Sequence, residues 1–106
     1  MNSVKKGSTN VYADLGYVNA QEMLVKAQLA SKIGEIIKRR KLTQTQASEL
    51  LGVPQPKLSN MLRGQFRGVS ETKMIECLTR LGSNVDIVVK SAYRSKTAGH
   101  VSVVFA

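Results

Sequence analysis

The sequence predicts a mainly helical protein, a bundle of about five helices followed by a short C-terminal β-strand or hairpin. Apolar residues recur at spacings of three and four across residues 20–82, and a glycine divides two short helical segments there. After residue 82 the apolar residues alternate instead. The 106 residues fit one domain. We divide them into a flexible N-terminal arm (1–19), a helical domain (20–82) and a C-terminal β segment (83–106).

The arm contains scattered apolar residues and no long apolar run, so it matches neither a signal peptide nor a membrane anchor. We interpret it as flexible or as a segment that binds a partner. Residues 20–40 then form a predicted amphipathic helix, long enough to break once. Its apolar positions are Met23, Ala27, Ala30, Ile33 and Ile37.

A short helix is expected to begin at Gln44. The Thr43 hydroxyl can cap it, while the Gln46 side chain reaches back to the Thr43 amide. Gly52 can adopt the left-handed conformation that ends a helix, and Val53 then enters the core. The residues expected on the inner face are Ala47, Leu50 and Leu51.

A second short helix is expected to start at Pro54 and Pro56, because a proline in the first turn removes only an amide without an intrahelical partner. The helical spacing separates two faces. The apolar stripe that packs inward is Leu58, Met61 and Leu62. The face left free for a partner is Pro56, Ser59, Asn60 and Arg63.

A last helix is expected between its N-cap Ser70 and Gly82. Its inward residues are Met74, Ile75, Leu78 and Leu81. Two candidate strands follow, with alternating apolar residues at Val85, Ile87 and Val89 and then at Val101, Val103 and Phe105. A two-stranded ribbon is only marginally stable alone, so its apolar face has to pack against another surface. We favour a second copy of the chain; the alternative is a hairpin that caps the bundle of a monomer.

The charge favours a nucleic-acid partner, since 16 Lys and Arg against 7 Asp and Glu give a net charge of +9. The excess brackets the two short helices, at Lys38, Arg39, Arg40, Lys41, Lys57, Arg63 and Arg67. The alternative is that the run from Lys38 to Lys41 only solvates a helix end and complements its dipole.

Few residues suggest chemistry. Cys77 is the single cysteine, which we expect to be a small buried hydrophobe in a reducing cytoplasm. One cysteine and the single His100 do not make a metal site. No catalytic set or phosphate-binding glycine loop is found, so the sequence predicts neither an enzyme nor a cofactor site.

The run from Leu42 to Gly64 resembles the helix-turn-helix of the phage-repressor-like (XRE-type) regulators, which have a lambda-repressor-like helical bundle. Its continuation to Lys90 resembles the subgroup in which a strand follows that bundle. The matching positions are Gln44, Ser48, Gly52, Leu58, Met61, Arg63 and Gly64. Ser48 replaces the usual alanine. Pro56 stands where the family often has a polar residue, so its base contact would be apolar.

The resemblance implies a transcriptional regulator that binds double-stranded DNA through the major groove as a dimer. We expect a cytoplasmic repressor, because a small domain without an activation surface acts most simply by occupying a promoter. Base-facing positions would be Gln55, Pro56, Ser59 and Asn60. The residues expected to position the protein on the DNA backbone are Gln44, Thr45, Lys57, Arg63 and Arg67.

An alternative of a different class is an antitoxin that neutralises a toxin protein and represses its own operon. Family members of this size with an extra arm resemble such antitoxins. In this hypothesis the toxin would be covered by apolar residues of the arm, namely Val11, Tyr12, Leu15, Tyr17 and Val18.

Overall fold

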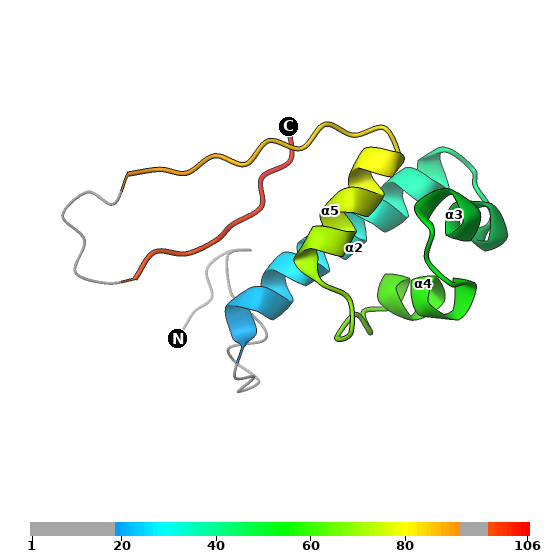
Figure 1. Ribbon diagram of the computed structural model, residues 1–106, viewed down its shortest axis with the longest axis horizontal. Helices are drawn as coiled ribbons and strands as arrows, with labels where there is room; N and C mark the ends of the chain where they lie inside the picture. The colour runs from blue at the N-terminus through cyan, green and yellow to red at the C-terminus, as the bar shows by residue number, and fades with distance from the viewer. Residues whose placement is uncertain (1–18, 92–97) are drawn as a thin grey trace.

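The computed structural model describes residues 19–91 and 98–106, and the predicted arm lies almost wholly outside them. The described residues form four helices and no strand. In chain order the helices are α2 (Ala20–Arg39), α3 (Gln44–Leu51), α4 (Gln55–Leu62) and α5 (Glu71–Arg80). Helices α2 and α5 lie against each other, and α3 and α4 lie together at one end of the bundle (Figure 1).

Helix α2 is continuous over its 20 residues, so the segment forms the one helix predicted for it and does not break. No proline interrupts it, and its buried face runs from Met23 to Ile37 against α4 and α5. The helix also runs through Gly34, where a Cβ would lie 3.4 Å from the Leu62 side chain. Burial of one unbroken stripe therefore holds the helix together.

Helix α3 begins and ends as predicted. The Thr43 hydroxyl accepts a hydrogen bond from the Gln46 amide at 3.1 Å, and the Thr43 amide donates to the Gln46 side chain at 2.9 Å. Gly52 ends the helix with a φ of 68°. Ala47 and Leu51 are fully buried, but Leu50 is 37% exposed. The inward prediction for Leu50 was wrong because its neighbour Leu51 already occupies the core face.

Helix α5 begins after Ser70, whose hydroxyl accepts from the Lys73 amide at 3.1 Å, which confirms the predicted cap. Three of its predicted inward residues, Met74, Leu78 and Leu81, are buried, and Ile75 packs partly buried against them. The core also takes in Phe66 and Val69 from the connection between α4 and α5, which the sequence analysis did not predict. One apolar core thus joins all four helices.

Residues 83–91 run away from the bundle and residues 98–106 return toward it, and we call these two segments the C-terminal ribbon (Figure 1). They form no strand, and their described residues make no hydrogen bond to each other, so the predicted strands are not formed here. Val85 and Val103 pack partly buried against the core. The ribbon leaves large apolar side chains exposed, at Ile87, Val88, Val89, Val101, Val104 and Phe105.

The ion pairs of the described residues all join side chains three or four positions apart on one helix. One of them includes the buried Lys26, whose ammonium lies 3.3 Å from Glu22. Because no ion pair in this part of the chain links two helices, the apolar core is the main stabilising contact between them.

Candidate nucleic-acid interface

The predicted contact residues converge on α3, α4 and the chain just after them. Gln44 and Thr45 form the start of α3, and Arg67 lies in the connection to α5. The others lie along α4 or at its C-cap: Gln55, Pro56, Lys57, Ser59, Asn60 and Arg63. Ser59 and Asn60 are half-buried, and the other predicted contact residues are exposed. The two buried residues of α4, Leu58 and Met61, point to the core as predicted.

Two contacts fix α3 and α4 relative to each other. The Ser48 hydroxyl donates to the Val53 carbonyl oxygen at 2.5 Å, within the turn between the helices. The Thr45 hydroxyl lies 3.4 Å from the Gln55 side-chain oxygen, so the first turns of the two helices meet. Ser48, which replaces the alanine usual in the resembling family, therefore contributes a bond that alanine lacks.

The side chain of Arg63 folds back onto α4. Its guanidinium donates to the Ser59 hydroxyl at 2.6 Å and to the Asn60 side-chain oxygen at 2.5 Å. The sequence analysis missed these contacts, although spacings of three and four on a helix allow them. They join three of the predicted contact residues into one hydrogen-bonded group.

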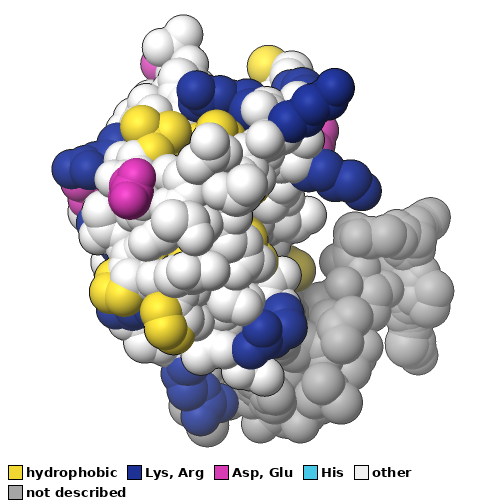
Figure 2. Space-filling model, turned by 90° about the vertical axis from the view of Figure 1, so that its right-hand side faces the viewer, with side chains coloured by type: hydrophobic (Ala, Val, Ile, Leu, Met, Phe, Trp, Pro, Cys, Tyr) yellow, Lys and Arg dark blue, Asp and Glu magenta, His cyan; other side chains and the backbone are white. Residues whose placement is uncertain are grey.

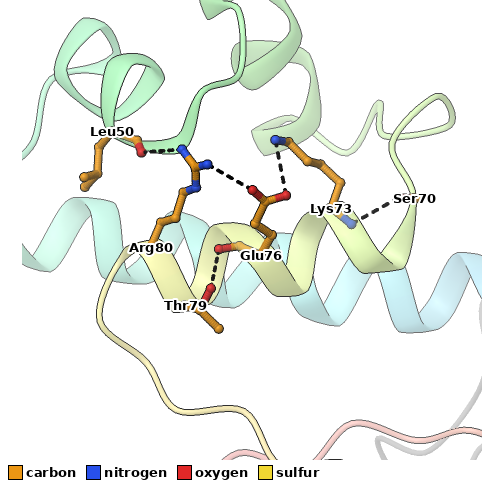
Figure 3. A network of polar contacts seen from close by, with 6 residues as sticks. All are labelled: Leu50, Ser70, Lys73, Glu76, Thr79 and Arg80. Carbon is orange, nitrogen blue, oxygen red and sulfur yellow. Dashed lines mark hydrogen bonds and ion pairs between the residues drawn. The ribbon is translucent and has the colours of Figure 1, made fainter.

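Arg80 braces the end of α3 from α5 (Figure 3). Its guanidinium donates to the Leu50 carbonyl oxygen at 3.4 Å and pairs with Glu76 at 3.1 Å. Glu76 also lies 3.5 Å from the Lys73 ammonium. A cation at the C-terminus of a helix interacts favourably with its dipole. Arg80 therefore holds α3 in place, and no local pattern in the sequence indicated this.

Lys and Arg side chains surround the α3–α4 end of the molecule (Figure 2). Part of the basic run at the C-terminal end of α2 makes contacts within the fold: Arg39 pairs with Glu35, and Arg40 donates to the Leu81 carbonyl oxygen at 3.2 Å. Within the described residues no ion pair involves Lys38, Lys41, Lys57 or Arg67. Arg39 and Arg40 thus make contacts within the protein, whereas Lys38 and Lys41 make no ion pair among the described residues.

The described residues hold no group of three His, Cys, Asp or Glu side chains that could bind a metal ion. Cys77 is buried, as predicted, and this burial raises the pKa of its thiol. None of the helices described is long and apolar enough to cross a membrane.

Comparison with known proteins agrees with this geometry. A family model described as a helix-turn-helix domain matches residues 11–90. No curated protein matches the chain. A solved structure described as an XRE family transcriptional regulator superposes with a TM-score of 0.75 and is 34% identical, covering 83% of this chain and 99% of that one. The chain therefore belongs to the family of XRE-type helix-turn-helix regulators.

Proposed function

We propose that the protein is a sequence-specific, dimeric transcriptional repressor that reads double-stranded DNA with α4. The observation that carries this proposal is the division of α4 into two faces. Leu58 and Met61 are almost fully buried, whereas a polar face looks outward beside the braced helix α3. We call this outward set the reading face, formed by Gln55, Pro56, Ser59 and Asn60. An α-helix with such a face fits the major groove.

The reading face combines hydrogen-bonding side chains with one apolar residue. Gln55, Ser59 and Asn60 carry groups that bond base edges, and Pro56 offers an apolar contact to a thymine methyl. The surrounding residues hold the protein on the phosphates without reading sequence. This group is Gln44, Thr45, Lys57, Arg63 and Arg67.

The C-terminal ribbon supports dimerisation with a second copy. Its described residues expose six large apolar side chains and have backbone groups without hydrogen-bond partners in that part of the chain. Such an edge favours pairing with another strand. The ribbon segments hold one Asp and one Lys, so they carry no net charge of their own. Two copies would place their reading helices about 34 Å apart, on successive major grooves.

We propose repression because a helix-turn-helix domain of this kind acts most simply by occupying a promoter. The runner-up function is an antitoxin that binds a toxin through the N-terminal arm and uses the same DNA contacts for autoregulation. A small protein that co-purifies with the chain, and is lost when residues 1–19 are deleted, would favour that function.

Fluorescence anisotropy with the DNA upstream of the gene and with a scrambled duplex tests the proposal. Both duplexes are titrated at two salt concentrations. We expect tight binding to the upstream DNA that survives competitor, with log affinity falling by about 0.9 per log unit of salt for each neutralised phosphate. Equal, salt-labile binding to both duplexes would contradict sequence-specific repression and direct attention to a protein partner.

A further inference from the structure

The orientation of the Asn60 amide is fixed by its neighbour. Arg63 donates to the Asn60 side-chain oxygen at 2.5 Å. A guanidinium carries only donors, so the amide has to turn its oxygen, and not its nitrogen, toward Arg63. A hydrogen bond to a charged donor is about twice as strong as one between neutral groups. Asn60 is therefore held with its Nδ2 group as the amide atom left for a partner.

Arg63 imposes the same polarity on Ser59. Its guanidinium donates to the Ser59 hydroxyl oxygen at 2.6 Å, so that oxygen acts as an acceptor toward the protein. A hydroxyl that accepts in this way keeps its own proton to donate. Ser59 and Asn60, which are neighbours on the reading face, thus both present donors.

Gln55 follows the same pattern at the start of α4. Its side-chain oxygen lies 3.4 Å from the Thr45 hydroxyl, a longer contact than those of Arg63. The donor again comes from the protein, which leaves the Gln55 amide nitrogen for an outside acceptor. The hydrogen-bonding side chains of the reading face therefore share one polarity.

We propose that Arg63 is a positioning residue that makes Ser59 and Asn60 hydrogen-bond donors, so that α4 selects guanine over adenine at the bases they face. This inference rests on the proposed DNA-reading function. Guanine presents two acceptors, N7 and O6, in the major groove, whereas adenine presents one acceptor beside the N6 donor. The usual bidentate contact of Asn with adenine needs the Asn oxygen turned toward the adenine N6 group, and here Arg63 turns that oxygen toward itself and takes one of its two lone pairs.

Arg63 keeps a role on the DNA backbone as well. A guanidinium has five N–H groups, of which two make the contacts to Ser59 and Asn60. The remaining donors suffice for a phosphate. Loss of Arg63 should therefore lower the affinity for all DNA and, in addition, change the base preference.

The test is selection of binding sites from a random duplex library, followed by anisotropy on duplexes that differ in single base pairs. Wild-type protein is compared with Arg63→Lys, Arg63→Met and the control Lys57→Ala. Wild type should prefer guanine over adenine by about tenfold at the base pair that Asn60 faces. Replacement of that guanine by 7-deazaguanine, which lacks the N7 acceptor, should weaken wild-type binding.

The two Arg63 variants separate positioning from charge. Lysine keeps the positive charge but lacks the fork that reaches two acceptors, so Arg63→Lys should retain affinity better than Arg63→Met. Both should bring the guanine-to-adenine ratio toward one. Lys57→Ala removes an exposed cation that has no described contact to Ser59 or Asn60. It should therefore weaken binding to the guanine and adenine duplexes equally and leave the guanine-to-adenine ratio unchanged. Circular dichroism checks that each variant retains its helices.

Two results would overturn the inference alone: selection of adenine by wild type at this base pair, or an unchanged ratio in both Arg63 variants. The second result would leave Arg63 as a backbone contact only. Wild-type protein that selects no sequence at all would instead overturn the proposed function, and the inference with it.

Discussion

Neighbouring side chains of α4 have opposite tasks. Leu58 and Met61 are almost fully buried, while Ser59 and Asn60, which lie between them in the chain, remain partly exposed. Helical spacing alone predicted this division, because a period of 3.6 residues assigns each position to a face. It did not predict the contacts of Arg63, since spacing shows which side chains can meet but not which rotamers they adopt.

Replacement of Asn60 by alanine should weaken binding to the preferred DNA site more than binding to other DNA. We expect Asn60→Ala to cost about 1 to 3 kcal/mol of binding free energy on the preferred site and to relax the choice at one base pair. Anisotropy on the preferred and a random duplex measures this difference. Arg67→Ala serves as the control, because it should lose a similar amount of binding free energy on both duplexes. Equal losses for Asn60→Ala would argue against its role in reading bases.

The thiol of Cys77 should be unreactive in the folded protein. Burial raises the pKa of this thiol, and the reactive thiolate is therefore even scarcer at neutral pH than in a free cysteine. Its reaction with an aromatic disulfide reagent should be slow in native buffer and fast in denaturant. The absorbance of the released thiolate gives both rates. Equal rates would show that Cys77 is accessible in the native state.

At the scale of the helices, the caps were predictable from the sequence, and the contacts that join one helix to another were not. Thr43, Ser70 and Gly52 act on residues close to them in the chain, so their local sequence indicates where helices begin and end. Arg80 contacts Leu50 across 30 positions of the chain, which no periodic pattern encodes. Phe66 was missed for a similar reason, because it enters the core from a connection without helical spacing.

The turn between α3 and α4 should not tolerate a side chain at Gly52. Its φ of 68° is left-handed, and a Cβ would lie 3.2 Å from the Arg80 guanidinium. Gly52→Ala should therefore lower the free energy of unfolding by about 1 to 2 kcal/mol, from the backbone term alone. Urea denaturation followed by circular dichroism measures this loss. Gly68→Ala is the matched control, because nothing lies within 4 Å of its Cβ position; equal stability of the two variants would contradict the argument.

At the scale of the whole molecule, the helical bundle was predictable from the sequence and the ribbon was not. A helix satisfies its backbone within one segment, so its pattern suffices to identify it. A strand needs a partner, and alternation at Val85, Ile87 and Val89 indicates a strand without showing what pairs with it. The ribbon residues have no such partner within residues 19–91 and 98–106, although Val85 and Val103 reach the core.

Charges placed on the ribbon should separate the proposed dimer. Ile87 is 78% and Val101 63% exposed, so the double variant Ile87→Glu, Val101→Glu should leave the bundle folded and shift the protein to a monomer. Analytical ultracentrifugation measures the molecular mass. The variant should also lose affinity for paired half-sites more than for one half-site. Thr72→Glu, an exposed change on α5, is the control that keeps the dimer; a monomeric wild type would refute the proposed pairing.

Because the ion pairs lie within single helices, salt should affect the stability of the fold and the binding of DNA differently. Added salt screens charges at the DNA contact but has little to weaken between the helices, where apolar burial dominates. A rise in ionic strength should thus release the protein from DNA in its native form, ready to rebind on dilution. Dissociation and denaturation would then be independent events, and an operator could be vacated and reoccupied without any refolding step.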